Sequence, residues 1–394
     1  MSRHTNKTGL AGIVFVLLAA VFQVFAADTL RIVTWNVENL FDTKGEGDET
    51  FTPTSWRRWT ADRYSQKLDR LAWVVDRMKP DILFVQEIQK RAVLEDLNAR
   101  IGKNHGWNFA AIGHFDSTDP RGIDTAIFSR HPIVSTNLVS SPGRRGTLVA
   151  GIKIGDEVVW CLGNHWKSQI GDAKENIVTR TKEAMLAREE ALKILRLNPD
   201  STLIIAGDFN DDCHEAALTS GLGAVTNRTQ VMRSLAWPDK DEPKEMVITT
   251  TTTLTKDTKS AKTKITSKTQ TDIEISSGED GILFYNMLGD VSPANKKSTP
   301  GSYYYARRKV WNTIDGIIVQ PRMLIPPDKP GPAWRVQAQT KHRTMTFALP
   351  EMRTDPDERP MSFSRVRIKN KPDNYYEEGY SDHFPVISEL IRAK

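Results

Sequence analysis

Short apolar runs recur along most of the chain, and several of them end in a carboxylate, amide or imidazole side chain. The clearest run is residues 203–206, four apolar residues of which two are β-branched, so we predict a strand buried on both faces. It passes without a linker into Gly207, Asp208 and Asn210. A strand that ends in oxygen donors suits a hard cation at a sheet edge, whereas an Asx-type turn is the structural alternative.

Two earlier strands have the same design. Residues 30–37 alternate between apolar and polar positions and place Asn36 near the end, either as a turn former or as an amide ligand. Residues 81–87 form an apolar run that ends in Glu87, which is either a solvated strand end or a ligand. Oxygen donors at several strand ends favour a shared site.

Later strands add imidazole and cationic groups. A hairpin over residues 147–154 and 157–163 leads to His165, whose neighbour Lys167 suits a phosphate. A surface or merely hydrogen-bonded histidine is the alternative. Residues 310–319 predict one strand that encloses Asp315, and a buried carboxylate requires a partner, for which a catalytic histidine makes chemical sense.

The last apolar segment contains adjacent Asp382 and His383. Neighbouring side chains point to opposite sides of an extended chain, so one can bind a metal while the other meets a substrate.

Helical periodicity separates these strands. Apolar residues three and four apart predict helices over residues 62–78, 92–101 and 179–197, and an aromatic strand is expected around residues 107–109. Strands that alternate with helices indicate an α/β fold.

Two segments depart from this pattern and are predicted as insertions, near residues 239–280 and 321–378. The first includes residues 248–268, almost entirely Thr, Lys, Ser and Asp, which we interpret as a mobile loop or an edge hairpin. The rest of residues 27–394 is predicted to be one catalytic domain.

The first 26 residues are predicted to be a cleaved signal peptide. Arg3 and Lys7 precede an apolar run, and small residues near Ala26 fit signal-peptidase cleavage better than the alternative of a membrane anchor. We therefore expect a secreted or periplasmic protein without a membrane span after cleavage.

Composition restricts the possible classes of protein only slightly. With 39% hydrophobic and 26% charged residues, the chain has the composition of a soluble globular protein. Loss of Arg3 and Lys7 lowers the formal charge from +5 to +3, which suits a phosphate-bearing substrate but not a protein that coats nucleic acid. Cys161 and Cys213 are the only cysteines, so a disulfide framework is excluded and one optional bridge stays open.

Six motifs occur in an order that resembles the endonuclease/exonuclease/phosphatase superfamily, including deoxyribonuclease I and exonuclease III. They are Trp35-Asn36-Val37, Val85-Gln86-Glu87, Asn164-His165, Gly207-Asp208-Phe209-Asn210, Ile314-Asp315-Gly316-Ile317 and Ser381-Asp382-His383-Phe384-Pro385-Val386. The resemblance implies a four-layer α/β sandwich, in which two face-to-face, mostly antiparallel β-sheets are flanked by helices. It also implies metal-dependent phosphoester hydrolysis.

The same resemblance assigns roles to the matching positions. Glu87 would hold Mg²⁺, or Mn²⁺ or Ca²⁺ instead, with Asn36 and Asp382. Five further residues would be catalytic: they would orient or activate a water and stabilise charge on phosphorus. They are His165, Asp208, Asn210, Asp315 and His383. Phosphoryl transfer depends on such positioning and charge neutralisation.

One departure concerns His165. Deoxyribonuclease I pairs its corresponding histidine with a glutamate, but residues 143–146 read Gly-Arg-Arg-Gly. Either His165 lacks this partner, or Arg144 or Arg145 brings positive charge to the phosphate. Arg145 and Lys167 are therefore our candidates for binding the substrate phosphate.

The expected activity is that of a secreted, endonuclease-like nuclease, monomeric, with nucleic acid as its phosphoester partner. A phosphatase or phosphodiesterase for lipid or inositol-type phosphoesters is the enzyme alternative, and a non-catalytic binding protein is the other. The sequence does not distinguish DNA from RNA or endo from exo cleavage.

Overall fold

A computed structural model describes residues 29–235, 246–257, 264–275, 281–290, 300–337, 344–354, 358–363, 366–367, 375–376 and 379–393. The predicted signal peptide, residues 1–26, lies outside these residues. No helix among the described residues is long and apolar enough to cross a membrane.

Two seven-stranded sheets form the centre of the molecule. The first has the order β16 (Trp334–Val336), β20 (Val386–Arg392), β1 (Thr29–Leu40), β2 (Ile82–Ile88), β4 (Asp124–Ser129) and β3 (Ala111–His114), and β17 (Met345–Thr346) also pairs with β20. The second has the order β5 (Ile133–Val139), β6 (Thr147–Ile154), β7 (Glu157–His165), β8 (Thr202–Asp208), β15 (Asp315–Val319), β12 (Phe284–Asn286) and β9 (Ala224–Val225).

Most neighbouring strands in both sheets are antiparallel. The parallel pairs are β1 with β2, β7 with β8, and β9 with β12. This agrees with the expected mostly antiparallel sandwich.

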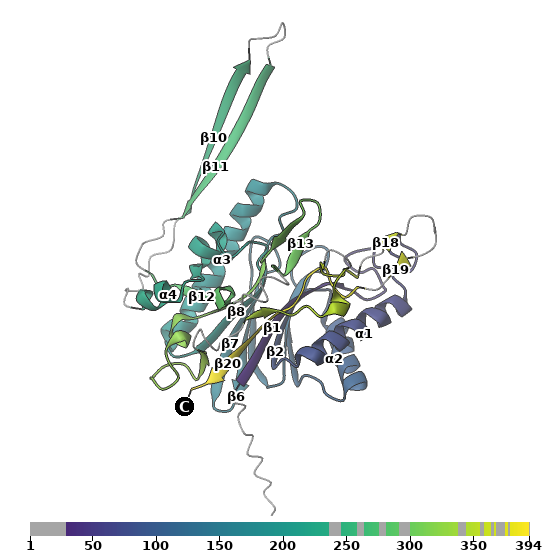
Figure 1. The fold of residues 1–394 in the computed structure, drawn as a ribbon. Helices are drawn as coiled ribbons and strands as arrows, with labels where there is room; N and C mark the ends of the chain where they lie inside the picture. The colour runs from purple at the N-terminus through teal and green to yellow at the C-terminus, as the bar shows by residue number, and fades with distance from the viewer. Residues whose placement is uncertain are drawn as a thin grey trace, which may run out of the picture.

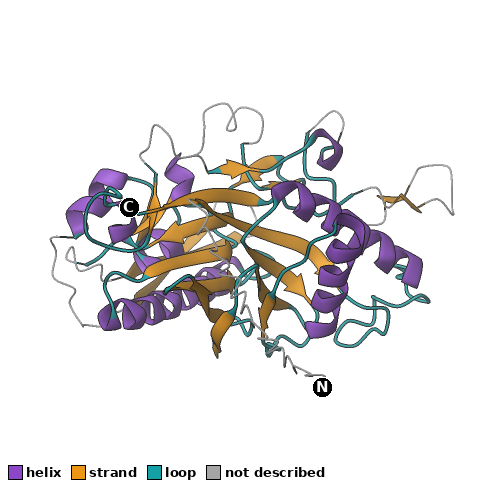
Figure 2. Ribbon diagram, turned by 90° about the horizontal axis from the view of Figure 1, so that it is seen from below, coloured by secondary structure: helices purple, strands orange, loops and turns teal. Residues whose placement is uncertain are grey.

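Helices cover the outer face of each sheet (Figures 1 and 2). On the first sheet lie α1 (Ala61–Met78) and α2 (Arg91–His105), and on the second lies α3 (Ala173–Leu197) with the π-helical turn η1 (Ala217–Leu222). The remaining helices are α4 (Arg228–Ser234) and the 3₁₀ turns η2 (Met287–Asp290), η3 (Pro321–Leu324) and η4 (Pro350–Met352). The predicted four-layer α/β sandwich is therefore confirmed.

Strand alternation explains the layering. In β1, Leu30 and Ile32 belong to the core between the two sheets, whereas Val33 and Trp35 pack with α1 and α2. Because successive strand residues face opposite sides of a sheet, a single strand contributes to two apolar layers.

Helix ends follow local capping. Thr60 caps α1 by accepting a hydrogen bond from the Arg63 amide, and α1 ends at Met78, where the C-cap residue Lys79 adopts the left-handed region at φ 47°. The third helix begins at Ala173, six residues before the predicted start, because the Asp172 carboxylate accepts from the Lys174 and Glu175 amides.

Two predicted strands were wrong in detail. Residues 310–319 form two strands, β14 (Val310–Asn312), paired with β13 (Tyr303–Tyr305), and β15 in the second sheet. The Asp212 carboxylate accepts a hydrogen bond from the Thr313 amide at 2.6 Å, so this N–H does not pair with a neighbouring strand. The aromatic strand expected at residues 107–109 is a loop, because the Phe109 amide donates to Asn98 Oδ1.

The Thr- and Lys-rich segment forms a hairpin, which was the second of its two interpretations, and not a loop. Strands β10 (Met246–Asp257) and β11 (Lys264–Ile275) pair only with each other, not with an edge of either large sheet. Figure 1 shows them projecting from the body of the molecule. A second small pair consists of β18 (Val366–Arg367) and β19 (Tyr375–Tyr376).

Replacing residues 246–275 with a short Gly-Ser linker should change the melting temperature by less than about 2 °C, because the hairpin backbone supports neither large sheet. Calorimetry measures this change. The control Ile205→Ala, in the buried strand β8, should destabilise the protein by about 2–5 kcal/mol. Failure of the shortened protein to fold would show that the hairpin is structurally required.

Cys161 and Cys213 do not form a disulfide with each other. Cys161 is fully buried in β7, and burial raises the pKa of its thiol well above the usual value. The optional bridge is therefore not formed in this structure.

Candidate active site

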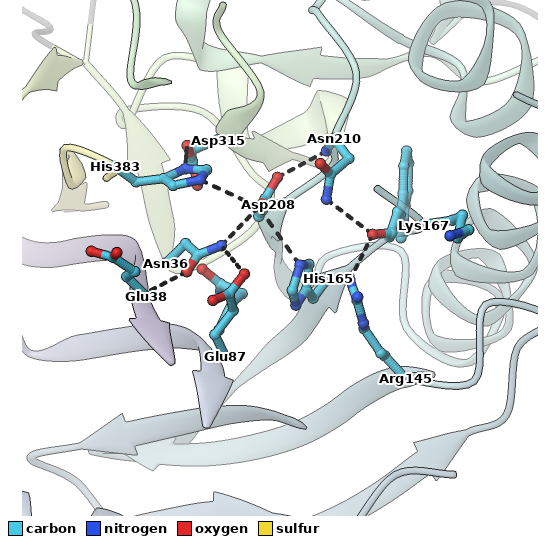
Figure 3. A network of polar contacts seen from close by, with 12 residues as sticks. Asn36, Glu38, Glu87, Arg145, His165, Lys167, Asp208, Asn210, Asp315 and His383 are labelled. Atoms are coloured by element: carbon cyan, nitrogen blue, oxygen red, sulfur yellow. Dashed lines mark hydrogen bonds and ion pairs between the residues drawn. The ribbon is translucent and has the colours of Figure 1, made fainter. Parts of the chain in front are cut away.

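The candidate site lies at the ends of strands from both sheets (Figure 3). The first sheet contributes Asn36 and Glu87 from β1 and β2. The second places His165, Asp208 and Asp315 side by side, because Asp208 is in register with His165 on one side and with Asp315 on the other. Side chains from six distant motifs thus meet as predicted.

Asp208 is the centre of the network and is 2% exposed. Its Oδ2 accepts a hydrogen bond from Asn36 Nδ2 at 3.0 Å, and its Oδ1 accepts from the Asn210 amide at 2.9 Å. Burial and the nearby Asp315 carboxylate raise the pKa of Asp208 to about 7. A carboxylate with a raised pKa is a stronger base than an exposed one.

The close approach of the β7 and β8 backbones explains why residue 207 is a glycine. Its φ is 151°, and a Cβ at this position would lie 2.0 Å from the Asn164 carbonyl oxygen. Only glycine allows β8 to pair this tightly with β7 immediately before Asp208.

Unfavourable backbone conformations are concentrated in the site. Glu38, Asn39, Glu87 and Asn210 all have φ between 50° and 66°, although none is glycine. The register of β1 and β2 shifts between Asn36 and Leu40, and that of β2 and β4 shifts around Glu87. Such bulges and strained residues re-aim side chains and are typical of functional sites.

His383 and Asp315 form the contact expected from the sequence. His383 Nδ1 lies 2.7 Å from Asp315 Oδ2, which also accepts from the Ser302 hydroxyl at 2.6 Å. Burial opposes the charged imidazole, but the Asp315 carboxylate outweighs it and raises the pKa of His383 well above its usual value. The Tyr303 ring packs against the imidazole with centroids 4.7 Å apart.

His165 has a different environment. Its Nε2 lies 3.7 Å from Asp208 Oδ2, whereas its buried Nδ1 has no hydrogen-bond partner. Burial and the positive charges of Arg145 and His383 lower the pKa of His165 well below its usual value. Within the described part of the chain, no carboxylate therefore pairs with His165 Nδ1, and the lowered pKa favours the neutral imidazole.

Arg145 is engaged behind His165 and is 6% exposed. Its Nη1 donates to the Trp166 carbonyl at 3.1 Å and its Nε to Asp119 at 3.3 Å. Its predicted phosphate contact stays a prediction, and the present contacts show that it supports the backbone next to His165.

Lys167 lies at the edge of the network, away from Asp208 (Figure 3). Its backbone amide donates to Glu183 Oε2 at 2.8 Å. Its role with the substrate phosphate also stays a prediction.

Comparison with known proteins identifies the family. A model of the endonuclease/exonuclease/phosphatase family matches residues 31–238, more than half of the chain. The chain belongs to this family. Its fold is that of metal-dependent phosphoesterases, in agreement with the reaction class expected from the sequence.

Several solved structures resemble the chain. Truncated Caenorhabditis elegans TDP2 is 13% identical, with 92% of this chain and 97% of that chain covered and a TM-score of 0.47. A Bacteroides thetaiotaomicron endonuclease/exonuclease/phosphatase family protein is 15% identical, with 92% and 98% covered and a TM-score of 0.49. A Staphylococcus aureus beta toxin double mutant with bound magnesium ions is 13% identical, with 93% and 99% covered and a TM-score of 0.47. No curated protein matches the sequence.

A divalent cation of the kind this family uses fits the oxygen-rich side of the site. Glu38, Glu87 and Asp382 lie close enough to affect one another: burial and the charges of Glu38 and Glu87 raise the pKa of Asp382 to about 8. Asp382 lies partly within the crowded site but keeps 42% of its side-chain surface exposed, so a ligand can reach it from solvent. Crowded carboxylates with a raised pKa are the donor set that a hard cation stabilises.

Asn36 connects the cation side to Asp208. Its Nδ2 donates to Glu87 Oε1 at 3.2 Å as well as to Asp208, and its Oδ1 accepts from the Glu38 amide. The predicted roles of Asn36, Glu87 and Asp382 as metal ligands stay predictions.

Glu87→Gln should weaken Mn²⁺ binding at least about tenfold, because a neutral amide replaces a carboxylate that the Asn36 side chain and the Asn39 amide hold in place. Titration calorimetry with Mn²⁺ measures the change. Glu95→Gln on the exposed face of α2 serves as a control without effect. Hydrolysis at full rate in excess chelator would contradict the prediction.

Several residues around the site escaped the sequence analysis. Glu38 lies two positions after Asn36, a spacing that puts two side chains on the same side of a regular strand and could have identified it. Its carboxylate accepts from the Phe363 amide at 2.7 Å.

Lys67 is fully buried on α1 and donates to the Tyr380 carbonyl at 2.7 Å. Burial lowers the pKa of Lys67 to about 8, against the opposing carboxylates Glu38 and Asp382. Its helical position resembles that of any exposed lysine, so no sequence signal revealed it. It anchors the backbone two residues before Asp382.

Proposed function

We propose that this protein is a secreted, divalent-metal-dependent phosphodiesterase that cleaves nucleic acid internally by means of an activated water. The arrangement of Asp208 between two histidines with opposite protonation preferences carries the proposal. The Asp315 carboxylate raises the pKa of His383, whereas burial and nearby positive charges lower the pKa of His165, so the two sides of a bound phosphate meet different groups.

Each side chain has a defined task in this proposal. Asp208 orients the water and accepts its proton. Asn210 holds the loop after β8 in place, because its Nδ2 donates to the Trp166 carbonyl at 3.0 Å. The His383 cation donates from Nε2, 4.0 Å from Asp208, to a phosphate oxygen, and neutral His165 adds a hydrogen bond from the other side. A bound divalent cation would supply Lewis-acid neutralisation of the phosphate charge.

The charge balance favours a diester over a monoester. Several carboxylates surround the reacting position, among them Glu87, Asp208, Asp315 and Asp382, and burial together with their mutual repulsion raises the pKa of Asp208 to about 7 and that of Asp382 to about 8. Arg145 is already engaged with Asp119 and a carbonyl. A singly charged phosphodiester costs less electrostatic free energy here than a doubly charged monoester.

The decisive experiment compares substrates with the purified mature protein. We expect Mg²⁺- or Mn²⁺-dependent nicking of supercoiled plasmid DNA and turnover of bis(4-nitrophenyl) phosphate, both abolished by chelator. Turnover of 4-nitrophenyl phosphate, a monoester, should be much slower. Faster turnover of the monoester, or of a lipid or inositol phosphoester, would overturn the proposal.

Secretion is tested separately. A chain lacking residues 1–26 should stay in the cytoplasm of the producing cell, whereas the full chain should be exported and begin at residue 27. N-terminal sequencing of the exported protein checks this.

A further inference from the structure

The hairpin of β13 and β14 lies next to the candidate catalytic histidine. Tyr303, the first residue of β13, forms a β-bridge with His383, and the two rings pack with centroids 4.7 Å apart. Burial and the carboxylates of Asp382, Asp208 and Glu87 raise the pKa of Tyr303 to about 12. The Tyr303 hydroxyl is therefore close enough for carboxylates from both sides of the site to act on it.

Hydrogen bonds fix the base of this hairpin to the site. The Ser302 hydroxyl donates to Asp315 Oδ2 at 2.6 Å, and the Ser302 carbonyl accepts from the Phe384 amide at 2.8 Å. On the other strand, Asn312 Nδ2 donates to Asp212 Oδ2 at 3.2 Å. The position of the hairpin is therefore set by contacts with the catalytic segments.

Three consecutive cationic residues form the tip of the hairpin, in the turn between its two strands. Arg307, Arg308 and Lys309 are all exposed, and among the residues that the structure describes no carboxylate forms an ion pair with them. The Arg308 amide donates to the Tyr305 carbonyl at 3.1 Å, and the Arg308 guanidinium lies 5.7 Å from the Tyr305 ring centre. Like charges in consecutive positions repel one another, and a polyanion relieves this repulsion.

The tip is within reach of a strand bound at the site. Arg307 follows Tyr303 by four positions, and a strand rises about 3.3 Å per residue, so the tip lies on the order of 13 Å from the Tyr303 ring and its histidine neighbour. Duplex DNA advances about 3.4 Å per nucleotide along each strand. The separation therefore corresponds to about four nucleotides, whereas a small phosphodiester offers no second phosphate for the tip.

We propose that the hairpin tip, Arg307, Arg308 and Lys309, binds the phosphates that flank the scissile bond of a nucleic-acid strand. This inference rests on the proposed function and names the residues that hold its long substrate. Carboxylates line the reacting position and repel a polyanion, so attraction has to come from groups outside it. Arginine and lysine contacts with phosphates position a strand without reading its sequence.

The test neutralises the tip and measures binding. The tip variant combines Arg307→Gln and Arg308→Gln with Lys309→Asn, because Lys309 has φ 54° and asparagine tolerates this conformation. A fluorescein-labelled phosphorothioate duplex, which resists cleavage, is titrated with the protein in Mg²⁺ between about 50 and 200 mM salt, and its anisotropy gives Kd. The tip variant should bind at least about tenfold more weakly at low salt. The slope of log Kd against log salt should fall by about 2 to 3, because each lost phosphate contact contributes about 0.9.

The matched control removes three positive charges far from the site. Lys103 and Lys193 lie near the ends of α2 and α3, and Lys329 follows the end of β15; each of these elements begins beside the site and runs away from it. All three lysines are exposed, and the control variant replaces each with glutamine. Its Kd should stay within about twofold of that of the unmodified protein. The melting temperatures of both variants should change by less than about 3 °C, because the substituted side chains are exposed.

Equal affinity of the tip variant and the unmodified protein would overturn the proposal, as would an equal loss in the control variant or no binding by the unmodified protein. If the tip variant loses binding only to phosphatidylserine vesicles, the tip is a lipid contact and the proposal is wrong. Cleavage at subsaturating DNA is measured in parallel, and the ratio of plasmid nicking to bis(4-nitrophenyl) phosphate turnover should fall at least about tenfold in the tip variant. Binding through the tip without cleavage of either substrate would remove the proposed function and keep this inference; cleavage of DNA without the tip effect would do the reverse.

Discussion

Asp208→Asn should lower kcat for bis(4-nitrophenyl) phosphate about 10³-fold at saturating Mg²⁺. The variant keeps the shape of the side chain and an oxygen for the Asn36 hydrogen bond, but it loses the basic group that accepts the proton of the attacking water. Steady-state kinetics measure the loss.

Asp211→Asn is the matched control. Asp211 is also buried and lies three positions further along, but its carboxylate pairs with Arg180 at 3.3 Å instead of with Asn36 or a site histidine. We expect it to destabilise the protein and to lower kcat by less than about tenfold. If Asp208→Asn retains more than a tenth of the activity, another group activates the water.

Asp208→Asn should also change how the stability of the protein depends on pH. The folded-state pKa of Asp208 is raised to about 7, so its ionisation opposes folding as the pH rises from about 4 through 7. In chelator, the melting temperature of Asp208→Asn should equal that of the unmodified protein near pH 4 and exceed it at pH 8. A lower melting temperature for the variant at pH 8 would contradict the raised pKa.

Asp315→Asn and His383→Ala should each lower kcat about 10²-fold or more, and the double variant should lose little beyond the worse single variant. Asp315 raises the pKa of His383 and fixes the ring through Nδ1, which in the proposed mechanism turns Nε2 toward the phosphate as a donor. Removing either residue removes the same transition-state stabilisation.

A second buried pair provides the control cycle. His114 Nε2 lies 3.0 Å from Asp124 Oδ2, and both side chains are at most 3% exposed, but neither contacts Asp208. Variants of this pair should be coupled in melting temperature while kcat changes little. Additive kcat losses for Asp315 and His383 would show that the two residues act separately.

The strands and their polar ends could be predicted because burial leaves a strong trace in sequence. The apolar run before Asp208 and the alternation before Asn36 each led to the correct strand. The break at Thr313 left no such trace, since it depends on a carboxylate from Asp212, a hundred positions earlier, that captures one amide. Apolar residues on both sides of that break concealed it.

The site was predictable in its membership but not in its geometry. A motif names Glu87, whereas the bulge and the φ of 66° that aim it arise only when β2 pairs with both neighbours. The absence of an acid behind His165 was visible in the sequence. The contacts of Arg145 with Asp119 and with the Trp166 carbonyl, by contrast, arise from tertiary packing and leave no trace in the sequence.

Because the site is divided between the two sheets, activity should depend strongly on how the sheets are aligned. Asn36 and Glu87 move with the first sheet, and His165, Asp208 and Asp315 move with the second, while the layer between them is filled by residues such as Ile32, Ile127 and Ala206. A substitution there that shifts one sheet by a fraction of an ångström would separate the cation side from the base without unfolding either. Turnover would then fail well before the cooperative melting transition, and the inner core would restrict evolution of the enzyme as strictly as its motifs do.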